Sequence, residues 1–166
     1  MRIVIFLMVS LVVLACKNPS QETKENNLVL DEKIETTVTA KALKAALMAD
    51  GFEIFDYIDE ETKDTILMQK YFMAFLKRGP NRSQTKVEAD SLQTLHLNHL
   101  GRMYKEGYAD ISGPFGDDGD IRGITIYNTP TFEIADSLAN MDPMVQSGRL
   151  IIELHPWWAA KGFPLR

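Results

Sequence analysis

The feature that most constrains the fold is the order of the segments between residues 66 and 155. Runs with strand-like alternation and runs with helical spacing follow one another as strand, helix, strand, strand, helix, strand. Connections rich in Gly, Pro, Asn and Asp separate them. This βαββαβ order is that of ferredoxin-like α+β folds, in which two helices cover one face of a four-stranded antiparallel sheet. We therefore predict an α+β domain of this class.

The local patterns also predict where these segments begin and end. In the long helix His96, His99 and Met103 share one face, and Gly107 follows its end. Thr129 and Pro130 are typical of a helix start, and Asp142-Pro143 indicates the end of that helix or a break. The predicted ranges are strands over 65–76, 108–112, 121–127 and 149–155, and helices over 86–106 and from 129 onward. Pro156-Trp157-Trp158 is expected to close the core region.

Two helices on one face of a sheet leave the other face bare. The predicted strands place large apolar side chains on both faces, so the second face needs a cover. A second copy of the chain, packed sheet to sheet, is the simplest one. We therefore expect a homodimer.

The N-terminal residues are typical of an export signal. Arg2 precedes an apolar run from Ile3 to Ala15 that is too short for a comfortable membrane anchor. Cys16, the single cysteine of the chain, follows this run in a setting that resembles the bacterial lipobox, where the cysteine is acylated. We predict a lipoprotein of the cell envelope attached to a membrane through its N-terminal lipid. Lys17 favours the outer membrane and its periplasmic side. The alternative is an ordinary signal peptide with an incidental cysteine.

The predicted organisation has four parts. Residues 1–15 are the lipoprotein signal peptide, 16–39 a polar tether, 40–66 an extension with a helix and a β-hairpin, and 67–160 the ferredoxin-like domain. The sequence leaves three roles open for residues 34–65. They could extend the sheet, cover a pocket or join a dimer contact.

Composition excludes several classes of function. The net charge of −5 gives no basic excess for a phosphate backbone, so we do not expect nucleic-acid binding. A single cysteine excludes an internal disulfide framework and a cysteine-based zinc cluster. Neither a phosphate-binding glycine motif nor a Gly-x-Ser-x-Gly elbow occurs. We expect no cofactor.

Several short motifs in order along the chain resemble those of the YciI-related domain family. They are His96-Leu97, Gly113-Pro114-Phe115, Asp117-Asp118-Gly119, Arg122-Gly123, Asp142-Pro143 and the run from Glu153 to Trp158. The resemblance covers roughly residues 68–160. It implies a dimeric α+β barrel of ferredoxin-like subunits. It also implies a pocket that contains a histidine of the first helix and the aspartate of the Asp-Pro step. One branch of that family resembles dehydrochlorinases that act on hydroxylated aromatic rings.

The candidate catalytic residues are His96 as general acid and base and Asp142 as its orienting partner. A carboxylate that accepts the imidazole N–H fixes the tautomer and stabilises the charged ring. Such a pair can move a proton on a small organic molecule, in an isomerisation or an elimination. That the two residues meet is implied by the resemblance alone. His96 could instead be an inert buried histidine, and Asp142 could simply cap a turn.

The other candidate residues have structural alternatives as well. His99 packs or lines the pocket rim, and a His-x-x-His pair without a third ligand does not predict a metal site. Arg122 pairs with the nearby aspartates or meets an anionic substrate. Trp157 is an aromatic wall for a flat ligand, or closes the core, or belongs to the dimer contact. Gly113 and Pro114 shape the mouth of the pocket.

Two hypotheses of function follow. The first is a lipid-anchored enzyme that uses His96 and Asp142 to transfer a proton on a small molecule. The second is a non-catalytic dimeric module that binds a small ligand or a partner. The first requires that the imidazole and the carboxylate meet at a pocket.

Overall fold

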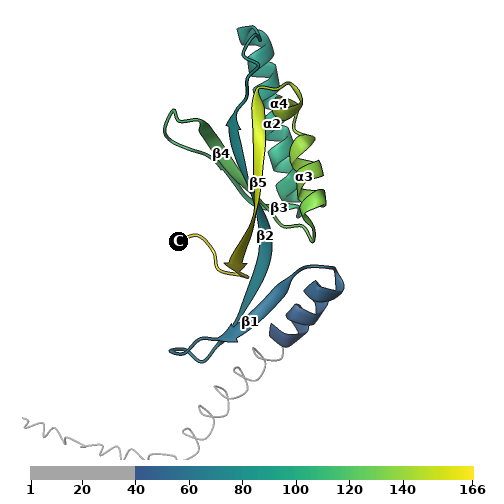
Figure 1. Ribbon diagram of the computed structural model, residues 1–166, viewed down its shortest axis with the longest axis vertical. Helices are drawn as coiled ribbons and strands as arrows, with labels where there is room; N and C mark the ends of the chain where they lie inside the picture. The colour runs from purple at the N-terminus through teal and green to yellow at the C-terminus, as the bar shows by residue number, and fades with distance from the viewer. Residues whose placement is uncertain (1–39) are drawn as a thin grey trace, which may run out of the picture. The chain divides into compact units, whose positions relative to one another are not determined.

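The structure, a computed structural model, describes residues 40–166 (Figure 1). The predictions for the signal peptide, Cys16 and most of the tether fall on residues 1–39, outside the described part. Within 40–166 no helix is long and apolar enough to cross a membrane.

The described chain forms a five-stranded antiparallel sheet with helices on one side (Figure 1). Its elements are β1 (Ile54–Ile58), β2 (Thr65–Arg78), α2 (Lys86–Lys105), β3 (Ala109–Pro114), β4 (Ile121–Tyr127), α3 (Phe132–Asn140), α4 (Pro143–Gln146) and β5 (Leu150–Ala160). Without β1 the spatial order of the strands is β5-β2-β4-β3. This is the ferredoxin-like arrangement, so the predicted fold class is confirmed.

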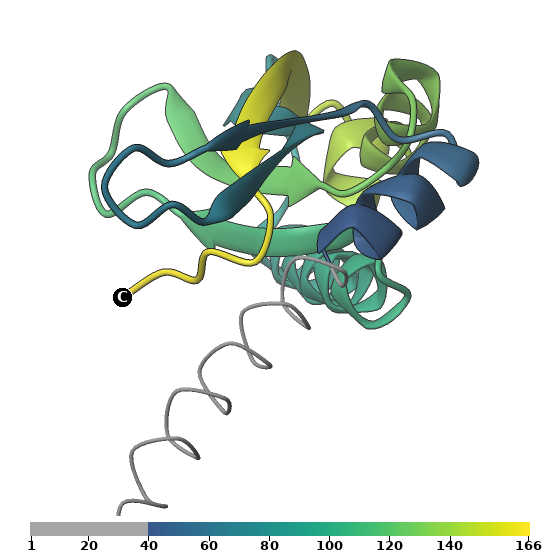
Figure 2. The same ribbon diagram turned by 90° about the horizontal axis from the view of Figure 1, so that it is seen from below.

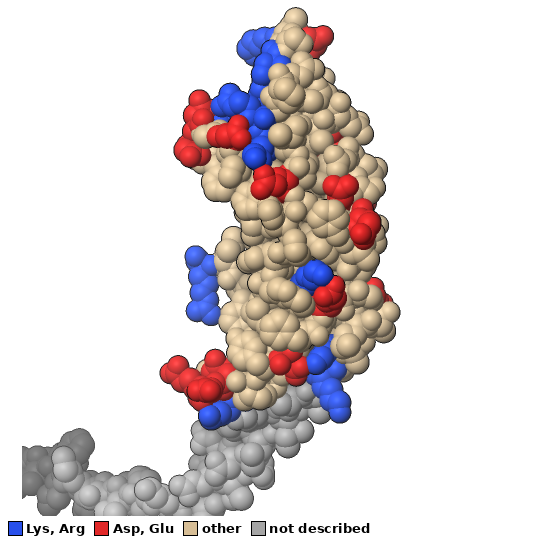
Figure 3. Space-filling view, viewed as in Figure 1, with Lys and Arg blue, Asp and Glu red and all other residues tan. Residues whose placement is uncertain are grey.

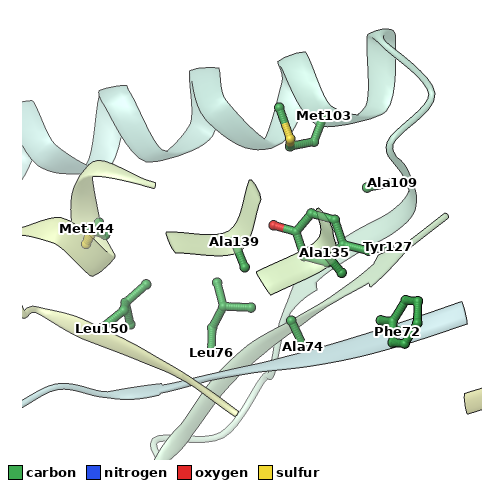
Figure 4. Close-up of a cluster of buried hydrophobic side chains, with 10 residues drawn as sticks. All are labelled: Phe72, Ala74, Leu76, Met103, Ala109, Tyr127, Ala135, Ala139, Met144 and Leu150. Atoms are coloured by element: carbon green, nitrogen blue, oxygen red, sulfur yellow. The ribbon is translucent and has the colours of Figure 1, made fainter. Parts of the chain in front are cut away.

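The hydrophobic core lies between the sheet and the helices. Phe72, Ala74 and Leu76 alternate along β2 and point toward the helices (Figure 4). Met103 of α2 faces them from the other side, and Tyr127 of β4 lies opposite Phe72 in the sheet. This period of two is the signature of a strand with one covered face.

The opposite face of the sheet carries the intervening residues. Met73 lies opposite Ile126, and Phe75 lies opposite Ile124 and Glu153. Some side chains of this face are substantially exposed, with 44% for Ile151. No helix among residues 86–146 packs on it (Figure 1). We call it the open face.

Two helix starts illustrate how local chemistry sets the boundaries. Thr85 and Glu88 form a reciprocal capping box at the beginning of α2. In α3 the cap is Thr131, whose hydroxyl accepts from the Ile134 N–H at 3.3 Å. The predicted start at Thr129 and Pro130 was therefore wrong by two residues. The Thr129 hydroxyl instead donates to the carbonyl of Thr131.

The last strand is longer than predicted. β5 continues through Pro156, Trp157 and Trp158 to Ala160, antiparallel to β2 throughout. A proline is tolerated here because β5 pairs with β2 alone among the described strands, and an edge strand does not need every N–H for the ladder. The two tryptophans therefore belong to the sheet and do not follow it.

Before the ferredoxin-like part, residues 40–49 are helical and a β-hairpin follows. Gly51, with a φ of +87°, turns the chain out of that helix. β1 pairs with the first residues of β2, on the edge that β4 occupies further along. An ion pair between Lys44 and Asp56 joins the helix to β1. Figure 2 shows the helix and the hairpin turn on opposite sides of the view. The hairpin thus extends the sheet.

Candidate functional site

His96 and Asp142 meet in the interior. The Nδ1 atom of His96 lies 2.5 Å from the Oδ2 atom of Asp142, across 46 positions of sequence. His96 is on the inner face of α2, with His99 and Met103 on the following turns. Asp142 is the residue that begins α4. Their exposed fractions are 8% and 2%.

Asp142 is held by a second contact. Its Oδ1 atom accepts a hydrogen bond from the Met144 N–H at 2.9 Å, and Pro143 occupies the first helical position. The break expected at Asp142-Pro143 is thus the start of a new short helix. Because one carboxylate oxygen caps α4 and the other contacts His96, the position of the imidazole is tied to two helices.

This contact defines the chemistry of the ring. An ionised carboxylate only accepts hydrogen bonds, so Nδ1–H donates to Asp142 and the neutral ring keeps a lone pair on Nε2. Nε2 makes no hydrogen bond to the described residues and is not a buried, unpartnered atom. It is the nitrogen left for a ligand.

His96 lines a cavity of about 390 Å³ between α2 and the ends of the strands. The sequence-predicted residues that share this cavity with His96 are Gly113, Pro114 and Arg122. Asp142 does not line it and lies behind the imidazole. Apolar residues supply much of the wall: Leu76, Leu97, Leu100, Met144 and Leu150. A volume of this order suits a small molecule.

Backbone geometry keeps the cavity wall close-packed at Gly123. A Cβ at this position would lie 2.6 Å from the carbonyl oxygen of Gly113. Gly123 lies opposite Pro114 in the β3–β4 ladder and opposite Leu76 in the β2–β4 ladder. The glycine lets the three strands converge beside His96.

Arg122 pairs with a nearby aspartate, which is one of the two roles that the sequence left open; contact with an anionic substrate stays a prediction. Its guanidinium donates to Asp118 at 2.8 Å and to the carbonyl of Gly119 at 3.0 Å. It also lines the cavity. Asp118 lies in the connection between β3 and β4.

His99 does not line this cavity. It is buried on the inner face of α2, its Nδ1 accepts from Arg102 at 3.3 Å, and its Nε2 has no partner among the described residues. Burial lowers the pKa of His99 below its usual value, and the nearby Asp142 opposes this. Of the two roles predicted for His99, the structure agrees with packing in the interior. A substrate contact in this cavity has no support, because His99 is not among the residues that line it.

Trp157 lies elsewhere as well. β5 puts it on the open face, where its ring packs on Tyr71 at 6.2 Å between centroids and 39% of the residue remains exposed. The alternation of the strand decides this, because Ile152 and Leu154 point toward the helices and Trp157 has the opposite parity. The prediction that Trp157 forms an aromatic wall of the cavity therefore has no geometric support.

Sequence reasoning missed two charged residues of the cavity. Arg82, in the connection after β2, and Arg149, just before β5, line it together with Arg122. Neither belongs to a motif, and the only signal was their place beside the Gly-containing turns at 79–81 and 148. Within residues 40–166, no three His, Cys, Asp or Glu side chains gather as metal ligands.

Comparison with known proteins gives a distant structural similarity. No protein-family model matches the chain, and no curated protein sequence matches it. Among solved structures it is similar to 5-chloro-2-hydroxyhydroquinone dehydrochlorinase (TftG) from Burkholderia phenoliruptrix AC1100, in complex with 2,5-dihydroxybenzoquinone. The identity is 20% and the TM-score 0.39, over 52% of this chain and 92% of that chain. The resemblance to the YciI-related family stays a prediction.

Proposed function

We propose that the chain is an enzyme that transfers a proton on a small organic molecule, with His96 as the acid and base and Asp142 as its positioning residue. The observation that carries this proposal is the 2.5 Å contact between the two side chains at the wall of a cavity. A histidine that is oriented by a carboxylate and lines a cavity has the geometry of a general acid and base.

The chemistry follows from the two ring nitrogens. Nε2 of neutral His96 removes a proton from a weakly acidic C–H or O–H of the substrate. The ring becomes cationic, and the carboxylate of Asp142 stabilises that charge through the Nδ1–H bond. Return of the proton to another atom completes an isomerisation. Departure of a leaving group with its bonding electrons completes an elimination instead.

The test is exchange of acidic protons for deuterium, followed by NMR with the full-length protein in detergent. The probes are small hydroquinones, 1,3-dicarbonyl compounds and lactones. We expect His96→Gln to slow exchange by about 10²–10⁴-fold, the range for a general base. Asp142→Asn should slow it as well, because the amide cannot stabilise the cationic ring by charge.

The matched control is His155→Gln. His155 lies on the open face, where its Nε2 contacts Glu153 at 2.9 Å, so its replacement should leave the exchange rate unchanged. If the wild-type protein exchanges every probe no faster than the His96→Gln variant does, the proposed chemistry is wrong.

We propose further that two open-face sheets pack together in a homodimer. The support is the apolar content of that face, which includes Met73, Phe75 and Ile151. A second copy would bury these side chains with the same residues on both sides of the interface.

The lipid anchor is also a proposal, and it rests on the sequence before Cys16. Cys16→Ser should yield unprocessed or soluble protein, and Ser10→Ala is the control because it leaves the cysteine in place. Membrane fractionation with metabolic labelling by a fatty acid measures both. Normal partitioning of the Cys16→Ser variant would contradict lipidation.

A further inference from the structure

Three arginines line the cavity that His96 lines. Arg82 comes from the connection between β2 and α2, Arg122 from β4, and Arg149 from the residue before β5. The described lining contains no Asp or Glu side chain. The one carboxylate of the dyad, Asp142, is engaged on the far side of the imidazole. The residues that line the cavity therefore include three arginines and no carboxylate.

Backbone contacts bring the two loop arginines together. The N–H of Gly79 donates to the carbonyl of Arg149, and the N–H of Asn81 donates to the carbonyl of Gly148, both at 3.0 Å. A Cβ on Gly79 would lie 2.2 Å from the Gly148 oxygen, so the two connections touch at a point that only glycine fits. These contacts bring together the two connections that carry Arg82 and Arg149.

The arginines differ in their partners. Arg122 shares Asp118 with Arg78, and Arg149 donates to the neutral amide of Gln84 at 3.0 Å. Among the described residues, neither Arg82 nor Arg149 forms an ion pair. Figure 3 shows basic atoms gathered in the upper part of the molecule with an acidic group beside them.

The clustering raises the electrostatic energy of Arg82. Burial lowers its pKa first, and repulsion from Arg149, Arg78 and Arg122 lowers it further. A bound anion would relieve this repulsion. Guanidinium forks match the paired oxygens of a carboxylate or a phosphate, and such charge-assisted hydrogen bonds are the strong ones.

We propose that Arg82, Arg122 and Arg149 bind the anionic group of the substrate, and that the substrate is a small organic oxyanion with an apolar body. The oxyanion is a carboxylate or a phosphate ester at the arginine end, and the apolar body lies against Leu76, Leu97 and Leu100. This inference rests on the proposed function, because only an enzyme has a substrate. It adds the chemical class of the molecule on which His96 would act.

The experiment is isothermal titration calorimetry of the full-length protein in detergent with three probes of one size. Benzoate and phenyl phosphate carry the two oxyanions, and benzyl alcohol is the neutral analogue. Either anion should bind about tenfold or more tightly than benzyl alcohol, and the tighter one identifies the group. Raising the salt concentration should weaken the anions only.

The arginine variants locate the site. Arg82→Gln combined with Arg149→Gln should lower the affinity for the tighter anion about tenfold or more, with little change for benzyl alcohol. Arg166→Gln removes the same charge at the chain end, outside the cavity, and should change nothing. His96→Gln should retain anion binding, which separates this inference from the proposed proton transfer.

Three results would overturn the inference. They are no binding of any probe, equal affinity of the anions and benzyl alcohol, or full anion affinity in the double variant. The first two need only the wild-type protein, so they hold even if the double variant fails to fold. Arginine-dependent anion binding without catalysed exchange would leave this inference standing and contradict the proposed function.

Discussion

The two faces of the sheet carry similar side chains and have different surroundings. On β2, Phe72 points toward the helices and is 3% exposed, whereas Phe75, three residues later, lies on the open face against His155. The covered face holds the core and borders the cavity with His96. The open face holds aromatic residues and a small network of charges. Strand alternation produces two faces, and what packs on each decides its role.

The largest expected effect tests this contrast within β2. Phe72→Ala should lower the free energy of unfolding by about 3–5 kcal/mol, the usual cost of emptying a packed aromatic site. Phe75→Ala should cost less at low protein concentration, because no helix of the described chain covers it. Urea unfolding at two protein concentrations measures both variants. Equal losses at low concentration would break the comparison between the faces.

A second prediction concerns what covers the open face. Ile151→Asp places a charge in the proposed sheet-to-sheet contact and should raise the dimer dissociation constant about tenfold or more. Val87→Asp is the control, since Val87 is exposed at the beginning of α2, where an acid suits the helix dipole. Sedimentation equilibrium gives the masses. A wild-type protein that stays monomeric at high concentration would contradict the dimer.

The smallest expected effect is on the pH dependence of stability, to which one residue of each face contributes in a different pH range. Because burial lowers the pKa of His99 from its usual 6.5, the unfolded chain binds this proton first as the pH falls. His99 faces Asp142, Arg102 and His96. The free energy of unfolding therefore falls as the pH drops from about 6.5 to the pKa of His99 in the folded protein. His99→Asn should flatten the stability profile in that range.

On the open face, Glu153 changes stability with pH as a carboxylate does when neighbouring groups stabilise its charged form. Lys77 and His155 lower the pKa of Glu153 from its usual 4.5, so its contribution is present above this pH and is lost below it. Glu153→Gln should flatten the profile only there. Urea unfolding between pH 3 and 8 measures both variants. The same profile for the two would show that the faces do not titrate separately.

Much of the fold could be predicted because its signals are local. The strand at 121–127 and the helix that begins at Lys86 have the predicted starts. The errors came where two readings of the local sequence were equally plausible. Thr131 competes with Thr129 as a cap, and Pro156 looks like an end until its strand is known to be an edge.

For the site, the residue types could be read from the sequence. The expectation that His96 contacts Asp142 came from the resemblance to the YciI-related family. The structure has that contact and adds the cap that Asp142 provides to α4. It also removes Trp157 and His99 from the cavity lining and introduces Arg82 and Arg149. These changes depend on strand parity and on loops that touch at Gly79, neither of which is a motif.

The sequence by itself determined the order of the elements, the apolar character of both faces of the sheet and the end of the long helix before Gly107. These depend on residues a few positions apart, whose spacing is written in the chain. Only the tertiary structure decided which face the helices cover and which arginines surround the imidazole. Those neighbours are far apart in sequence, and packing alone brings them together.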